Sequence, residues 1–305
     1  MKVGIIGRTG ILLESAKALR LAGHDLVFVI TCRPEPFYDK NEKDFQDFAI
    51  ELDIPFYDTL NLEDYIHEIK ALEADICISI NWLNTIGKEF LSIFPQGILN
   101  AHAGDLPRYK GNASVNWAIL NFENRIAVTI HKMVEEIDSG PYLLKEFLDI
   151  NENTYISDVY NWLESTIPKK FVEALDVIKT KGFIDQDQSI KTLRTYPRKP
   201  SDSKINWAWN EEFILAMIRA SSHPFDGAFC FVNDTDLKLK IFRASRFHPD
   251  FDFSAVPGQV CFKFGDLPVV ATRNGLIAIE ECLISNMNNI DSMRFITNSL
   301  RNRLT

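Results

Sequence analysis

The sequence predicts an α/β protein in which a doubly wound, mostly parallel sheet is followed by a smaller, all-β part. In the first half, short β-rich runs alternate with helix-like stretches, which is typical of a parallel sheet with helices on both faces. Beyond about residue 200, short apolar runs are separated by Gly, Pro, Asn and Asp turns, as in a small antiparallel barrel or sandwich. The length of 305 residues also favours two domains, because single cores stop growing at about 250–300 residues.

The spacing of apolar residues predicts each strand and helix of the first half. Apolar runs such as ICISI fit strands that are buried on both faces of a sheet. Helices are expected where apolar residues recur every three to four positions. The expected strands are 2–7, 25–31, a short run at 54–59, 75–80, 97–103, 126–133 and 142–150, and the expected helices are 10–22, 62–72, one opening near Ala113, and 156–181.

The change of texture near residue 200 marks a domain boundary. The stretch RTYPRKPSDSKINWAWN combines two prolines with Ser and Asp turn formers and shows no periodicity, which is typical of a linker. We therefore expect a first domain over 1–200, a linker over about 190–205 and a second domain over 205–305. The second domain should open with a helix over 211–220 and continue as five short strands.

Composition excludes several classes of protein. The net charge is −9 and no Lys/Arg block is present, which counts against a large nucleic-acid partner. No apolar run approaches the roughly 20 residues needed to span a bilayer. The five cysteines are scattered and never form a CxxC pair, which disfavours a disulfide framework and structural zinc. The N-terminus lacks the pattern of a signal peptide, so we expect a cytoplasmic protein.

The glycine-rich stretch GIIGRTG follows the first expected strand and precedes a helix. Its spacing is GxxGxxG and not GxGxxG, and no acidic residue ends the next strand at FVIT. A dinucleotide site requires both features. A tight turn is the favoured interpretation, and an NAD-dependent oxidoreductase is disfavoured.

Two polar residues, Asn100 and His102, interrupt an apolar strand in GILNAHAGDLPRYKG. They lie two positions apart, so their side chains point to the same face. At the carboxyl end of a central parallel strand they would stand where open α/β sheets bind ligands. Each alone could be a core group with a satisfied hydrogen bond. Asp138, in the loop EEIDSG, is by itself a turn former, but next to His102 it would orient the imidazole and accept a proton. His131 is interpreted as a partly buried strand residue.

These motifs carry a family resemblance. Asn100-x-His102, LPRYKG, NASVNWAIL, VTIHKM and IDSGPYL resemble, in order and spacing, the core of the 10-formyltetrahydrofolate-dependent formyltransferases. Beyond the linker, INWAWN, IRASSHPFDGAF and LKLKIFRAS are similar to the second domain of the two-domain members. Within the family, the match is strongest to nucleotide-sugar N-formyltransferases, such as the formyltransferase portion of the enzyme that modifies UDP-4-amino-4-deoxy-arabinose. Methionyl-tRNA formyltransferase is a further relative.

The resemblance implies a Rossmann-like formyltransferase fold followed by an OB-like barrel, and roles for three residues. Asn100 would donate a hydrogen bond to the formyl oxygen, His102 would polarise that oxygen or accept the amine proton, and Asp138 would orient the imidazole. Attack of an amine on a formamide builds negative charge on oxygen and positive charge on nitrogen, so a donor and a base are both needed. The formyl donor is 10-formyltetrahydrofolate, and no metal is called for.

Binding residues follow from the same resemblance. The loop side chains of Arg108, Tyr109 and Lys110 are expected to contact a substrate phosphate or diphosphate. The pterin of the folate is expected among the loops after the fourth and later strands. The residues assigned to the cofactor are Asn81, Trp82, Leu83, Glu136 and Ile137.

Charge decides between the acceptors. The second domain carries the acidic stretches NDTD and PDFDF, which favours a UDP- or dTDP-linked amino-deoxysugar, as used in lipopolysaccharide or O-antigen biosynthesis, over tRNA. Methionyl-tRNA formyltransferase acting on initiator tRNA is the alternative. A binding protein without catalysis is disfavoured because Asn100, His102 and Asp138 are all present. Folate and a nucleotide sugar are the expected partners, and a homodimer is left open.

Overall fold

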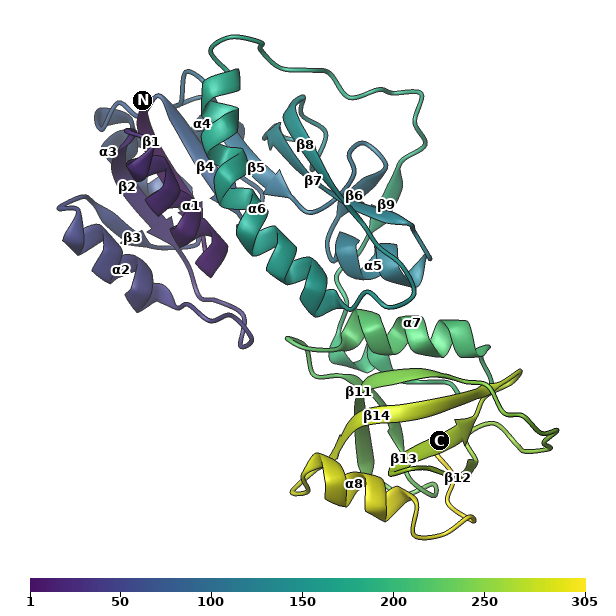
Figure 1. The fold of residues 1–305 in the computed structure, drawn as a ribbon. Helices are drawn as coiled ribbons and strands as arrows, with labels where there is room; N and C mark the ends of the chain where they lie inside the picture. Colours follow the sequence, from purple (N-terminus) through teal and green to yellow (C-terminus); the bar gives the residue numbers. More distant parts are fainter. The chain divides into compact units, whose positions relative to one another are not determined.

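The structure is a computed structural model that describes residues 1–305, and it divides into two compact units, each built around its own sheet (Figure 1). The first unit comprises residues 1–114, 125–149 and 160–196. The second comprises residues 115–124, 150–159 and 197–305. None of the helices combines the length and the apolar content needed to cross a bilayer.

The first unit contains a seven-stranded sheet with the order β3-β2-β1-β4-β5-β7-β8. The pairs among β1 to β5 are parallel, whereas β7 is antiparallel to both β5 and β8. The predicted doubly wound, mostly parallel sheet is therefore confirmed. The strands are β1 (Lys2–Gly7), β2 (Asp25–Thr31), β3 (Phe56–Asp58), β4 (Ile76–Ile80), β5 (Ile98–His102), β7 (Arg125–Lys132) and β8 (Tyr142–Asp149).

Helices cover the sheet and supply its core. They are α1 (Gly10–Leu21), α2 (Glu42–Glu51), the 3-10 turn η1 (Leu62–Tyr65), α3 (Ile66–Ala71), α4 (Lys88–Leu91) and, from residue 160 on, α6 (Ile156–Val177). Helix α5 (Ser114–Leu120) belongs to the second unit except for its first residue. On one face, Ile6, Cys77 and Ile98 pack with Ile69 of α3 and Phe90 of α4. Helix α1 packs against β1, β2 and β4 and contributes no side chain to that cluster.

Four elements of the first unit were not predicted, and one of them is the four-residue helix α4. Helix α2 lies in a polar stretch whose mean hydropathy is too low to reveal a buried face, although Phe45, Phe48 and Ala49 are buried. Its start is fixed by a capping box between Asn41 and Asp44. The other two are short strands, β6 (Tyr109–Gly111) and β9 (Leu193–Thr195), which pair in parallel.

The second unit contains a five-stranded antiparallel sheet with the order β10-β11-β14-β13-β12. The C-terminal residues 302–305 meet both of its edges. Leu304 bridges to Val232 beyond β10, and Arg303 bridges to Gln259 before β12. The predicted antiparallel β domain is confirmed, and this segment closes it. Its elements are η2 (Pro200–Ser203), α7 (Glu211–Ser221), β10 (Ala228–Phe231), β11 (Lys238–Phe247), β12 (Val260–Phe264), β13 (Leu267–Ala271), β14 (Leu276–Ile284) and α8 (Asn289–Ile296).

The predicted linker is ordered. Residues 193–195 form β9, and residues 200–203 form η2. Ile205 and Trp207 are buried in the core of the second unit. The stretch predicted as a linker therefore contains short elements of its own, because proline and mixed charge do not reveal pairing partners that lie far away in sequence.

Candidate active site

Asn100 and His102 lie at the carboxyl end of β5, an interior strand of the sheet. In the register with β7, Asn100 lies opposite His131 and His102 lies opposite Thr129. Opposite residues of an antiparallel pair share a face. The four side chains therefore project from the same face of the sheet, which is the face on which Ile98 packs in the core.

The His102 imidazole is held by the backbone. Its Nε2 lies 2.7 Å from the carbonyl oxygen of Tyr109, to which it donates, and the residue is 8% exposed. Its Nδ1 lies 3.7 Å from Oδ2 of Asp138. Because a carbonyl oxygen only accepts, Nε2 carries a hydrogen, and Nδ1 is the ring nitrogen that faces the carboxylate.

Asp138 stands between two imidazoles. Its Oδ2 accepts a hydrogen bond from the Gly111 backbone N–H at 2.8 Å. Its Oδ1 lies 3.6 Å from Nε2 of His131, as its Oδ2 lies near His102. Gly111 has φ +105, and a Cβ there would overlap the Thr195 carbonyl. Glycine is thus required where the backbone amide reaches the carboxylate.

Loop GDLP is also tightly fitted against His102. A Cβ on Gly104 would overlap the His102 ring and the Tyr109 carbonyl, the two partners of the hydrogen bond described above. The Gly104 carbonyl itself accepts from Oγ1 of Thr129 at 2.7 Å. The glycine therefore permits the close approach that orients the imidazole.

His131 belongs to this cluster, although sequence reasoning assigned it to the strand only. It is 2% exposed. Its Nδ1 lies 3.1 Å from the Lys132 carbonyl, to which it donates, and its Nε2 accepts from Nδ2 of Asn100 at 3.2 Å. Asn100 therefore retains its second amide hydrogen for another acceptor. The position of His131 opposite Asn100 in the register of β5 and β7 reveals its membership, but this register requires knowledge of which strands pair.

Burial lowers the pKa of His131 to about 4, and the nearby His102 is the second cause. The ordinary value is 6.5, so between these two pH values the unfolded chain binds more protons than the folded one. The free energy of unfolding should therefore decrease as the pH falls through this window, by up to about 1.4 kcal/mol per pH unit. Urea unfolding at pH 7 and pH 5 measures this loss. The His131→Asn variant should lose less stability over the same interval, and an equal loss would contradict the assignment.

The three predicted phosphate-binding side chains differ in their positions. Tyr109 and Lys110 are buried. The Lys110 Nζ donates to Oγ of Ser139 at 2.8 Å, next to Asp138 in sequence. Arg108 is exposed, with its guanidinium carbon 5.4 Å from the centre of the Tyr109 ring. Tyr109 and Lys110 thus contact neighbouring protein groups in this structure, and the phosphate contact stays a prediction for all three residues.

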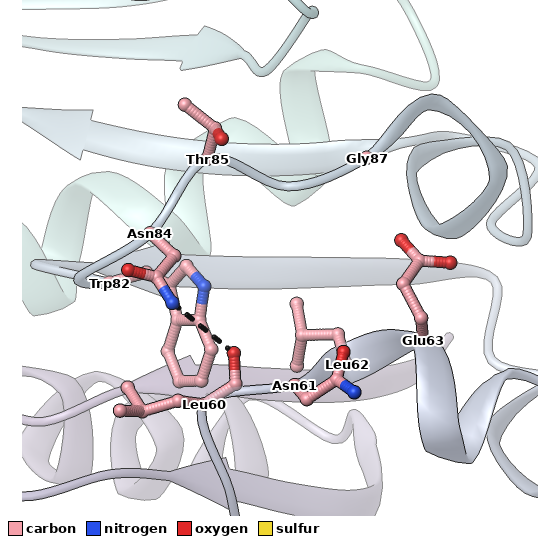
Figure 2. A pocket seen from close by; sticks show the side chains of 8 residues that line it. All are labelled: Leu60, Asn61, Leu62, Glu63, Trp82, Asn84, Thr85 and Gly87. Carbon is pink, nitrogen blue, oxygen red and sulfur yellow. Dashed lines mark hydrogen bonds between the residues drawn. The ribbon is translucent and has the colours of Figure 1, made fainter.

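A cavity of about 340 Å³ opens at the carboxyl ends of β3 and β4 (Figure 2). Leu60, Leu62 and the Trp82 indole form its apolar wall, and Asn84 donates through Nδ2 to the Leu60 carbonyl at 3.3 Å. The Trp82 indole N–H is buried without a partner. The lining residues are Leu60, Asn61, Leu62, Glu63, Trp82, Asn84, Thr85 and Gly87. The cavity thus combines this apolar wall with polar side chains from Asn61, Glu63, Asn84 and Thr85.

The other residues assigned to the cofactor do not line this cavity. Asn81, at φ +52, accepts from Nε of Arg8 through its carbonyl and donates through Nδ2 to the Tyr38 hydroxyl. Leu83 is exposed. Glu136 and Ile137 are exposed in the loop that leads to Asp138. No group of three or more His, Cys, Asp or Glu side chains is arranged to hold a metal ion.

Comparison with known proteins identifies both units. A model of formyl transferases matches residues 1–175, and a model of the formyl transferase C-terminal domain matches residues 198–299. The chain is 28% identical over 287 residues to the methionyl-tRNA formyltransferase of Thermodesulfovibrio yellowstonii, which corresponds to 92% of this chain and 90% of that protein.

Solved structures share the fold. The N-formyltransferase from Helicobacter canadensis, in complex with folinic acid and dTDP-3-aminofucose, matches with a TM-score of 0.68 and 20% identity, over 92% of this chain and 99% of that one. HypX from Aquifex aeolicus, in complex with tetrahydrofolic acid, matches with a TM-score of 0.64 and 17% identity, over 94% of this chain. The chain spans 44% of the length of HypX. Since the first family model covers more than half of the residues, the chain belongs to the formyl transferase family, whose members are one-carbon transferases.

Proposed function

We propose that the protein transfers a formyl group from 10-formyltetrahydrofolate to the amine of a UDP- or dTDP-linked amino-deoxysugar. The observation that carries this proposal is the cluster of Asn100, His102 and Asp138 at the carboxyl edge of the sheet. It combines a hydrogen-bond donor with a free N–H and a pair of groups that can pass a proton. Amide-forming transfer to an amine needs these two capacities.

The residues of the cluster have separate tasks. Asn100 donates its second N–H to the formyl oxygen, where negative charge develops as the amine attacks the formyl carbon. The proton lost by the amine passes to the His102–Asp138 pair at the Nδ1 side, where the carboxylate stabilises positive charge. The bond between the formyl carbon and the donor nitrogen then breaks, and that nitrogen takes up the proton. The folate, when bound, supplies a chemically activated formyl group.

The cavity beside Trp82 supports folate as the donor. Its volume, the flat Trp82 indole and the polar side chains of Asn61 and Asn84 suit a heteroaromatic ring system that also forms hydrogen bonds. Trp82 is thus assigned to the cofactor, as expected from the sequence. Glu136 and Ile137 would contribute from the loop before Asp138.

Charge supports the nucleotide sugar as the acceptor. The acidic residues Asp234, Asp236, Asp250 and Asp252 are all exposed in the second unit, where they would repel a phosphate backbone. Arg108 is the exposed cation next to the cluster, and we assign it to the substrate diphosphate. Such a reaction would take place in the cytoplasm and feed lipopolysaccharide or O-antigen biosynthesis. The likeness to a methionyl-tRNA formyltransferase over 92% of the chain keeps initiator tRNA as the second candidate.

The proposal is tested by turnover. The protein is incubated with 10-formyltetrahydrofolate and a panel of UDP- and dTDP-linked amino-deoxysugars, while tetrahydrofolate release and formylation of the sugar are measured. We expect both products with at least one sugar and none with charged initiator tRNA. Formylation of the tRNA alone would replace the sugar by the second candidate, and the absence of any product would overturn both.

A further inference from the structure

The loop that carries Asp138 connects β7 to β8 and has few contacts of its own. Residues 134–137 are exposed. Asp138 adopts φ +55, in the left-handed region, which is unfavourable for an L-residue. Such a turn persists only when surrounding groups hold it in place.

Gln186 supplies this support from a distant part of the chain. It is 5% exposed, and its Nε2 donates to the carbonyl oxygen of Asp138 at 2.8 Å and to that of Gly140 at 2.7 Å. An amide nitrogen has two hydrogens, so both are used on this turn. The two carbonyls flank Ser139, and one donor can reach both of them only while the turn keeps its left-handed geometry.

The segment that carries Gln186 is itself anchored. Ile184 and Tyr142 exchange two backbone hydrogen bonds, at 2.8 and 2.9 Å, so residue 184 is fixed to the start of β8. On the other side of the turn, Gly111 N–H holds the Asp138 carboxylate and Lys110 holds the Ser139 hydroxyl. The turn is therefore fixed through its carbonyls by Gln186 and through its side chains by β6.

We infer that Gln186 is a positioning residue that acts through Asp138, by holding its carboxylate between the His102 and His131 rings. The catalytic consequence rests on the proposed function, whereas the structural consequence does not. Loss of the two N–H donors would release the turn, and the carboxylate would no longer meet the Gly111 amide. A displacement of about 1 Å at a catalytic group can cost about a hundredfold in rate.

Two replacements test the inference, with a matched control. Gln186→Leu and Gln186→Met, whose unbranched side chain has nearly the same length, both remove the two donors, and the second serves if the first does not fold. Gln46→Leu is the control, because it is the same substitution at an exposed position of α2. We expect both Gln186 variants to lose about tenfold to a hundredfold in kcat with KM almost unchanged, and the control to keep its activity.

A double-mutant cycle separates positioning from general support. In the Asp138→Asn background, Gln186→Leu should cause little further loss of kcat, because its effect passes through the carboxylate that is already absent. An equal loss of kcat in both backgrounds would overturn the inference, since a residue that only stabilises the whole fold would lower kcat with or without the Asp138 carboxylate.

Hydrogen exchange gives a readout that does not depend on activity. The Gly111 amide, which donates to Asp138, should exchange about tenfold faster in Gln186→Leu. The adjacent Asn112 amide donates to the Thr195 carbonyl instead and should be unchanged. Unaltered protection at Gly111 would overturn the inference. If the wild-type protein formylates no acceptor, the proposed function fails, and the exchange measurement still decides the role of Gln186.

Discussion

Replacement of His102 by asparagine is expected to lower kcat by about two to four orders of magnitude. Asparagine can fill part of the space of the imidazole, but it cannot take up a proton, so the Nδ1 that faces Asp138 at 3.7 Å is lost. The loss should appear in kcat, because the proton is transferred as the amine attacks. The measurement is tetrahydrofolate release under saturating donor and acceptor.

The matched control is His67→Asn, the same substitution at an exposed position of α3, which should leave kcat unchanged. Binding of folate to His102→Asn can be followed by the fluorescence of Trp82 and should stay close to that of the wild type. Turnover within a few-fold of the wild type would remove His102 from the chemistry. Loss of folate binding together with activity would instead indicate a misfolded site.

Replacement of Asn100 by alanine should lower kcat by about a hundredfold to a thousandfold, the usual effect of losing an oxyanion donor. Its Nδ2 is shared between His131 and the position proposed for the formyl oxygen. KM for both substrates should change little, since the donor acts most strongly on the charge that develops during the reaction. Steady-state kinetics with both substrates varied provides the measurement.

Asn100→Asp distinguishes donation from packing. Aspartate has nearly the same size, but its ionised carboxylate donates no hydrogen bond and repels an oxyanion. If the N–H group is what matters, this variant should be at least as slow as Asn100→Ala. Near-normal activity of Asn100→Asp would show that the side chain acts by its volume alone.

The sheet of the first unit could be predicted from sequence because its strands are signalled locally. Apolar runs such as 76–80 are buried on both faces, and their pattern differs from that of the helices between them. Asn100 and His102 could be paired for the same reason, since the alternation of a strand is a local rule. Helix α2 gives a weaker signal, because charged residues surround its apolar positions Phe45, Phe48 and Ala49.

The cluster around Asp138 depends on contacts between residues that are far apart in sequence. Asp138 itself was found by resemblance, because an aspartate in a loop is by composition only a turn former. His131 and Gln186 were not identified as members of the cluster. Their roles depend on the register between β5 and β7 and on a segment 46 to 48 residues beyond the turn. Contacts between residues so far apart in sequence leave no periodic pattern in it.

The discontinuous make-up of the second unit affects how the protein can be divided. Its core includes Tyr155, which belongs to the segment 150–159 and lies just before the first residue of α6. The Tyr155 hydroxyl donates to the Ala244 carbonyl at 3.1 Å and accepts from the Ala244 N–H at 3.3 Å. A fragment that begins at residue 197 would therefore leave a hole where this ring sits and an unpaired strand amide beside it. The two units are thus interleaved along one polypeptide, and proteolysis at residue 197 would not release the second as an independent folding unit.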